Sequence, residues 1–299
     1  MRAPRVRNLV RAETNVRMGD IGLEFAPAAL ADAIEENAVA FNLLPAYMPC
    51  AELHDEPDLL WFTTGLPYPV FNGVLRARFP PGAIDVRIEG VLARFRSSEL
   101  PLTWHVGPST RPLDLGQRLT AYGLACSARL PGMAICPAVA QATAPAPPGL
   151  AITPVQDARE LQDWLRPVAE GFGFAPNMAS ATYGLYAGLG FGPRRPLQHF
   201  AGRLRGEVVS SGSLYVTGDV AGLYCIATSP PYRRQGIGTA MTLALLRAAQ
   251  ARGCRLAVLY ATALGASLYR RIGFETYCHQ TFYTWPSTEV GWFDEGCGE

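Results

Sequence analysis

The sequence predicts a mixed α/β protein built from two domains, and three observations support this class. Its 299 residues exceed the length of one average domain. The segment PAVAQATAPAPPGL at 137–150 is rich in proline and alanine and uncharged, as is typical of an extended linker. Beyond it, strand and helix patterns alternate. We therefore expect an N-terminal domain at 1–137, a linker at 138–149 and a second domain at 150–299.

The second domain can be divided into elements in chain order. It opens with a short strand, LAITPV, and a helix whose N-cap candidate is Asp157. Alternating residues then predict an antiparallel meander of three strands, with turns at Arg205-Gly206 and Gly218-Asp219. A strand, helix, strand, helix unit and a last strand pair follow. The predicted meander strands lie at 197–204, 207–216 and 220–228, the next helix at 236–252, the apolar strand CRLAVLYA at 254–261, the second helix at 265–273 and the final pair at 274–285.

The first domain shows signs of an internal repeat. The segment FNGVLRARFPPGAIDVRIEGVLARF at 71–95 also predicts a strand, a Pro-Pro pair and a helix. Pro80-Pro81 precede Pro230-Pro231 by 150 residues, and Leu119 and Gly123 precede Tyr269 and Gly273 by the same interval. A shared interval at two motifs predicts a duplication. The copies differ in one respect, because the second inserts YRRQGIG before its helix where the first has only GAID.

Composition excludes several classes of function. The net charge of +1 predicts no nucleic-acid or membrane surface, and all 26 basic residues are arginine, so no lysine chemistry is available. No window contains the roughly 18 consecutive apolar residues of a membrane span. The arginine-bearing N-terminus lacks the apolar core of a signal peptide, so we expect a cytoplasmic protein. Seven dispersed cysteines and four dispersed histidines predict no metal site.

The turn SPPYRRQGIG at 229–238 has the features of an anion site. The first amides of a helix lack backbone partners and favour negative charge, and Gly236 and Gly238 leave room for an anion beside the backbone. Arg233 and Arg234 add charged donors, an arrangement that suits a pyrophosphate. A P-loop is excluded by the lack of lysine, and the dinucleotide fingerprint lacks its third glycine.

Two motifs in the second domain resemble those of the GNAT superfamily of acyl-CoA transferases. IATSPPYRRQGIG is similar to motif A, whose core R/Q-x-x-G-x-G/A is matched by Arg233, Gly236 and Gly238. GASLYRRIGFETY is similar to motif B, commonly A-x-x-x-L-Y-x-x-x-G-F, with Gly265 at the alanine position. The resemblance covers about 150–286 and implies two tandem GNAT-like domains, each a central mixed, mostly antiparallel sheet flanked by helices.

The resemblance also implies a binding site for coenzyme A. In this family the loop amides hold the pyrophosphate and the preceding strand binds the pantetheine arm, with an amide near Ile226 or Ala227 facing the thioester oxygen. The implied coenzyme-binding residues are Ile226, Ala227, Thr228, Arg233, Arg234, Gln235, Gly236, Ile237, Gly238 and Thr239.

For catalysis, Tyr269 matches the motif B tyrosine that protonates the departing thiolate, as a phenol with a pKa near 10 can do at neutral pH. At the position that corresponds to Tyr269, the first domain has Leu119, whose side chain cannot donate a proton. No general base follows from spacing, and Glu170, Tyr224 and His279 remain open candidates, each alternatively a structural residue. Phe172, Phe174 and Tyr183 are candidates to line an apolar acceptor pocket, although aromatic residues at such spacing also occur in cores.

The implied function is an acetyl-CoA-dependent N-acetyltransferase that acts by direct attack in a ternary complex. The absence of an acidic run favours a small-molecule amine over a basic protein as acceptor. A non-catalytic coenzyme A sensor or scaffold, and a protein or peptide N-acetyltransferase, are the alternatives. We expect the first domain to be a degenerate copy without a coenzyme site that helps shape the acceptor site. Either a monomer or a homodimer is compatible with the sequence.

Overall fold

The computed structural model describes residues 26–140 and 146–287. Its centre is one sheet of 11 strands in the order β1-β2-β3-β4-β11-β5-β10-β9-β8-β7-β6. Two neighbouring pairs, β3 with β4 and β9 with β10, are parallel, and the other pairs are antiparallel. The strands are β1 Glu52–Asp55, β2 Leu59–Thr63, β3 Asn72–Ala77, β4 Leu102–Val106, β5 Ala125–Ile135, β6 Leu150–Pro154, β7 Leu197–Leu204, β8 Glu207–Thr217, β9 Val220–Thr228, β10 Leu256–Tyr260 and β11 Glu275–Trp285.

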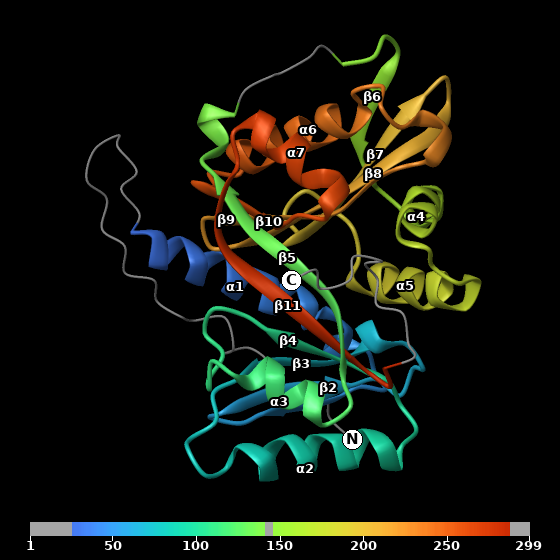
Figure 1. Ribbon diagram of the computed structural model, residues 1–299. Coiled ribbons are helices and arrows are strands. Elements are labelled where there is room, and N and C mark those ends of the chain that lie inside the picture. Colours follow the sequence, from blue (N-terminus) through green and yellow to red (C-terminus); the bar gives the residue numbers. More distant parts are fainter. Residues whose placement is uncertain (1–25, 141–145, 288–299) are drawn as a thin grey trace.

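Seven α-helices among the described residues cover the two faces of this sheet. One face carries α2, α3, α6 and α7, and the other carries α1, α4 and α5. Figure 1 shows α6 and α7 beside the strands of the second half and α2 and α3 beside those of the first half. The helices are α1 Pro27–Asn42, α2 Ile84–Ser97, α3 Leu115–Ala121, α4 Ala158–Phe172, α5 Pro176–Leu189, α6 Ile237–Ala251 and α7 Ala263–Ile272.

The elements predicted for the second half are confirmed, with one exception. Asp157 caps α4, since its Oδ1 accepts the amide of Glu160 at 2.8 Å, and the three meander strands, both later helices and β10 lie where expected. The expected strand pair at 274–285 is wrong. The segment is the single strand β11 of 11 residues. The run TYCHQTFYTW contains no Gly, Pro, Asn or Asp that would turn the chain, which is the local reason for its continuity.

The strand order confirms the predicted repeat. When β1 to β5 are matched to β7 to β11, the sheet reads as a palindrome, with β6 added at one edge. Leu130 pairs with Gln280, its own counterpart 150 residues away, so the approximate twofold axis passes between β5 and β11. The bulges also repeat at this interval, at Ser127 and Tyr277.

The two halves exchange their last strands. β5 of the first half lies between β10 and β11 of the second, and β11 lies between β4 and β5 of the first. In Figure 1 these two long strands run side by side through the middle of the molecule. The linker therefore separates the halves in sequence, while the sheet is continuous across them. Of the linker, the structure describes a 3-10 turn, Pro137–Val139, and the residues just before β6.

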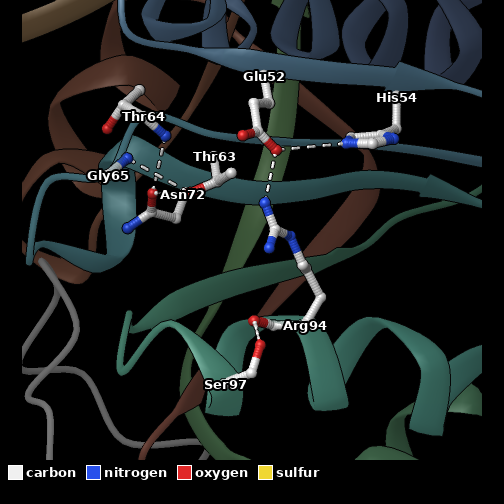
Figure 2. A network of polar contacts seen from close by, with 8 residues as sticks. All are labelled: Glu52, His54, Thr63, Thr64, Gly65, Asn72, Arg94 and Ser97. Carbon is white, nitrogen blue, oxygen red and sulfur yellow. Dashed lines mark hydrogen bonds and ion pairs between the residues drawn. The ribbon is translucent and has the colours of Figure 1, made fainter.

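A buried asparagine fixes the start of β3 in the first half. Asn72 Oδ1 accepts the Thr63 hydroxyl at 2.9 Å and the Thr64 amide at 3.0 Å (Figure 2). Its Nδ2 donates to three carbonyl oxygens, those of Leu66, Tyr68 and Pro101. Because Pro101 precedes β4, one side chain holds the turn before β3 and the parallel neighbour in place. Nearby, Glu52 pairs with Arg94 and lies 3.9 Å from His54, on the solvent side of the same half (Figure 2).

Replacing Asn72 with alanine is expected to lower the free energy of unfolding by about 2 to 4 kcal/mol, because it leaves several buried partners unsatisfied. Urea denaturation followed by circular dichroism measures the change. Asn42→Ala is the matched control, since Asn42 makes one hydrogen bond, to the carbonyl of Ala38, and should cost less than about 1 kcal/mol. Equal losses for the two variants would contradict this role of Asn72.

Candidate active site

The site is built where β9 leaves its parallel partner. Pairing of β9 with β10 covers Val220 to Gly222 only, although β9 continues to Thr228. On its other side β9 stays paired with β8 as far as Thr228. We call residues 224–228, on the side that faces away from β8, the open edge of β9. It leads into the turn SPPYRRQGIG and then into α6.

The backbone direction along the open edge follows from one hydrogen bond. The Ser229 amide donates to the Val209 carbonyl of β8 at 2.9 Å. Since backbone groups alternate in direction along a strand, those of Ile226 and Thr228 point away from β8. The Thr228 carbonyl accepts Nε of Arg233 at 3.1 Å on this side. Ile226 thus offers an amide donor and a carbonyl acceptor to an extended ligand along the open edge.

The turn after β9 presents backbone amides and positive charge together. Arg234 has φ +63° and Gly236 has φ +80°, so the chain winds closely before α6 begins at Ile237. No side chain caps this helix, and its first turn has no acidic residue, whereas α4 and α7 are capped by Asp157 and Thr262. The amides of Ile237, Gly238 and Thr239 are the first three of the helix and have no intrahelical partner.

Polar side chains precede these amides in the turn. Arg233, Arg234 and Gln235 are exposed, and neither arginine forms an ion pair with any residue in the described ranges. Gly238 lies close to α7, because a Cβ there would sit 3.3 Å from Cδ1 of Leu268. An uncapped helix start beside two guanidinium groups that have no carboxylate partner among the described residues fits a phosphate or pyrophosphate.

Tyr269 lies on α7, which packs against α6. Its ring is 9% exposed and meets Phe274 edge-on at 5.8 Å. A Cβ on Gly265 would lie 2.7 Å from Tyr269 Cε2, so in this chain the Tyr269 ring packs against a position that has no side chain. Burial raises the pKa of the Tyr269 phenol, and no described residue hydrogen bonds to its hydroxyl. It is therefore a protonated donor at neutral pH.

The first half has matching elements with different residues. At the Tyr269 position, α3 has the fully buried Leu119. In β3, the edge that corresponds to the open edge of β9 is covered by another segment of the first half. The Arg111 amide donates to the Ala77 carbonyl and the Phe79 amide donates to the Arg111 carbonyl, both at 3.0 Å. In addition, α2 has Asp85 in its first turn.

Helix α1 of the first half covers β9 on the face of the sheet that lies opposite α6 and α7. The Tyr224 hydroxyl donates to Oδ1 of Asn37 at 2.7 Å, and its ring stacks on Phe41 with centroids 3.7 Å apart. Asn37 in turn donates to Thr217 Oγ1 at 2.8 Å. Burial raises the pKa of Tyr224 well above the ordinary phenol value, so the phenol stays protonated at neutral pH and no phenolate is present to accept a proton. No sequence pattern marks Asn37 or Phe41, since α1 lies far from β9 in the chain.

The other predicted residues fall into two groups. Phe172, Phe174 and Tyr183 pack at the edge of the same cluster as Tyr224, and this cluster contains residues of both halves, including Leu44 and Phe71.

The adjacent Glu170 is exposed near the end of α4, whose Gly171 approaches Ala227 so closely that a Cβ on it would lie 2.8 Å from the Ala227 Cβ.

His279, in contrast, is exposed on β11. Strands β5 and β10 separate β11 from β9. Because neighbouring strands are about 4.8 Å apart, His279 is roughly 14 Å from the open edge. It is therefore too distant for direct proton transfer there. In the described ranges no cluster of His, Cys, Asp or Glu could hold a metal ion, and no helix is long and apolar enough to cross a membrane.

Comparison with known proteins agrees with this geometry. Residues 159–274 match the model of the acetyltransferase (GNAT) family. A GCN5-related N-acetyltransferase from Kribbella flavida is 18% identical with a TM-score of 0.66, over 84% of this chain and 95% of that one. One from Sphaerobacter thermophilus is 15% identical with a TM-score of 0.57, over 87% and 93%. No curated protein sequence matches the chain.

A third structure bears on the arrangement of the two halves. It is a tandem GNAT protein from the clavulanic acid biosynthesis pathway, 15% identical with a TM-score of 0.56, and the alignment covers 87% of this chain and 96% of that one. At such identities the likeness concerns the fold. The chain therefore has a GNAT fold repeated in its two halves, and residues 159–274 match the model of the acetyltransferase (GNAT) family.

Proposed function

We propose that this protein is an acetyl-CoA-dependent N-acetyltransferase that transfers the acetyl group to a primary amine of a small molecule. The observation that carries the proposal is the open edge of β9 running directly into an uncapped, arginine-flanked helix start. A strand edge suits the amide-containing pantetheine arm, and the turn suits the pyrophosphate. The GNAT family match over 159–274 supports the same assignment.

Coenzyme binding is assigned mainly to the main chain. Ile226, Ala227 and Thr228 would hold the pantetheine arm, with the Ile226 amide directed toward the thioester oxygen. Arg233 to Thr239 would hold the pyrophosphate, with the guanidinium groups and the Gln235 amide beside it. Because most of these contacts use the backbone, side-chain changes that preserve its path should affect affinity little.

Chemistry is assigned to Tyr269 and to the fixed amide. The amine nitrogen attacks the thioester carbon, the Ile226 amide stabilises the negative charge that develops on oxygen, and Tyr269 gives its proton to the departing sulfur. The Tyr224 hydroxyl is held by Asn37 as a hydrogen-bond donor. We therefore assign Tyr224 to binding of the acceptor amine and not to proton abstraction. Glu170, exposed and one residue from the contact of α4 with β9, is the carboxylate we propose to receive the amine proton.

Two measurements test the proposed function. Isothermal titration calorimetry with coenzyme A and acetyl-CoA tests binding, and thiol release from acetyl-CoA in the presence of a panel of primary amines tests transfer. We expect both binding and amine-dependent thiol release. Binding without release for any small or peptide amine would favour a coenzyme A sensor or scaffold, and peptide-dependent release alone would favour a protein N-acetyltransferase.

One coenzyme site per chain is expected. We propose that residues 1–137 are a degenerate copy without coenzyme, because Arg111 fills the strand edge and Asp85 places a negative charge at the helix start. Residues 150–299 would form the catalytic domain. A calorimetric stoichiometry near one supports this division, whereas a stoichiometry of two would contradict it.

A further inference from the structure

A bulge in the open edge of β9 is held in an unusual conformation. Ser211 pairs with Ala227 and Ser213 with Tyr224, so Cys225 and Ile226 both lie opposite Gly212. Cys225 has φ +51°, a left-handed value that residues with a side chain seldom adopt. The bulge immediately precedes the Ile226 amide, and its geometry therefore determines where that amide points.

Three side chains hold Cys225 in this conformation. The Tyr186 hydroxyl of α5 lies 3.7 Å from the Cys225 Sγ, and the Ser213 hydroxyl also contacts this sulfur. The Ser211 hydroxyl donates to the Cys225 carbonyl at 3.0 Å. Both serines are fully buried. The side chain and the carbonyl of the bulge residue are thus each fixed by a polar partner.

These anchors are themselves rigidly packed. Tyr186 is 7% exposed and packs against Trp164 and His199, with ring centroids 5.8 Å and 4.6 Å away. The Nδ1 atom of His199 lies 2.8 Å from the Ser213 hydroxyl. Burial raises the pKa of the Cys225 thiol to about 11 and lowers that of His199 to about 3, so both are neutral at pH 7. A protonated thiol serves here as a hydrogen-bonding partner and not as a nucleophile.

The first half provides an internal comparison. Its strand β3 has a bulge at Leu75, which corresponds to Cys225 at the interval of 150 residues. Leu75 is buried without a left-handed φ, and its apolar side chain has no polar anchor. The anchored left-handed bulge thus occurs in the half that has the open edge, and not in the half whose edge is closed.

We propose that Tyr186 is a positioning residue that acts through Cys225 to aim the Ile226 amide at the carbonyl oxygen of bound acetyl-CoA. This inference rests on the proposed function. Loss of the anchor would let Cys225 relax toward an ordinary extended conformation and turn the amide away. The coenzyme would still bind, since the pyrophosphate turn does not depend on Tyr186.

The test is the 13C resonance of [1-13C]acetyl-CoA bound to the full chain, which needs no acceptor. A hydrogen bond to the carbonyl polarises it and moves the bound signal downfield of the free signal. Tyr186→Phe should lose about half or more of this displacement, while calorimetry shows acetyl-CoA affinity changed by less than about twofold. In a thiol-release assay with an amine that the wild type accepts, kcat should fall about tenfold at an unchanged acetyl-CoA KM.

Two further variants separate positioning from general damage. Glycine adopts positive φ without an anchor, so Cys225→Gly in the Tyr186→Phe background should restore most of the displacement. Tyr277→Phe is the matched control, because the Tyr277 hydroxyl donates to the exposed Glu275 on β11, and it should leave the signal unchanged.

The outcomes separate a failure of the Tyr186 positioning role from a failure of the proposed function. A full downfield displacement in Tyr186→Phe, or no recovery in the double variant, would overturn the positioning role while leaving coenzyme binding established. Failure of the wild-type chain to bind acetyl-CoA would overturn the proposed function, and this inference with it.

Discussion

Tyr269→Phe is expected to lower kcat by about 100-fold while the affinity for coenzyme A changes by less than about twofold. In our proposal the phenol protonates the leaving sulfur, and a positioned acid contributes about 10² to 10⁴ in rate. Phenylalanine keeps the packing against Gly265 and Phe274, so the coenzyme site should be preserved. Thiol release gives kcat, and calorimetry gives the affinity.

The pH dependence provides a second measure of the same residue. Burial raises the pKa of Tyr269 above the ordinary value near 10, so the proton is present throughout the neutral range and is lost only at higher pH. In wild type, kcat should show no decline due to this group below about pH 10. Tyr122→Phe, at the end of the corresponding helix α3, is the matched control and should keep full activity. Wild-type turnover in Tyr269→Phe would remove this residue from the mechanism.

Gly236→Val is expected to weaken coenzyme A binding by about 100-fold, which corresponds to about 2.7 kcal/mol. Gly236 has φ +80° directly before α6, and a β-branched side chain is strongly disfavoured there. The turn would have to open, and the amides of Ile237 to Thr239 would no longer converge on one anion. Calorimetry with coenzyme A measures the loss.

The repeat supplies a close control for this glycine. Gly82 has φ +87° and lies just before α2, and a Cβ on it would meet no atom within 4 Å. Gly82→Val should cost similar folding stability and leave coenzyme affinity unchanged, because the first half holds no coenzyme in our proposal. If both variants lost affinity equally, the effect would reflect general destabilisation and the role of the Gly236 turn would be refuted.

Short-range sequence signals account for what could be predicted. The meander strands, α4, α6 and α7 are marked by alternation, an Asp cap and stop glycines, all of which act within a few residues. The proposed coenzyme turn rests on equally local signals, since Arg233, Gly236 and Gly238 lie within six residues. The duplication could be detected because its interval of 150 residues recurs. The sequence nevertheless predicts two strands where the structure has the single strand β11.

The parts that could not be predicted depend on contacts between distant residues. Asn37 and Tyr224 are 187 residues apart, and Tyr186 and Cys225 are 39 apart on different elements. No local pattern marks such pairs, because each residue type is also common in ordinary cores. The left-handed φ of Cys225 is equally invisible, since cysteine has no preference for that conformation.

The exchange of β5 and β11 has a consequence for the newly made chain. During synthesis, the first half emerges with β4 and β5 but without the strand that lies between them, which ends at Trp285. Two strand edges therefore stay uncovered until Trp285 has left the ribosome, a state in which exposed edges favour aggregation. A truncated first half should behave as an aggregation-prone fragment, and the sheet should become complete between β4 and β5 only after β11 has been translated.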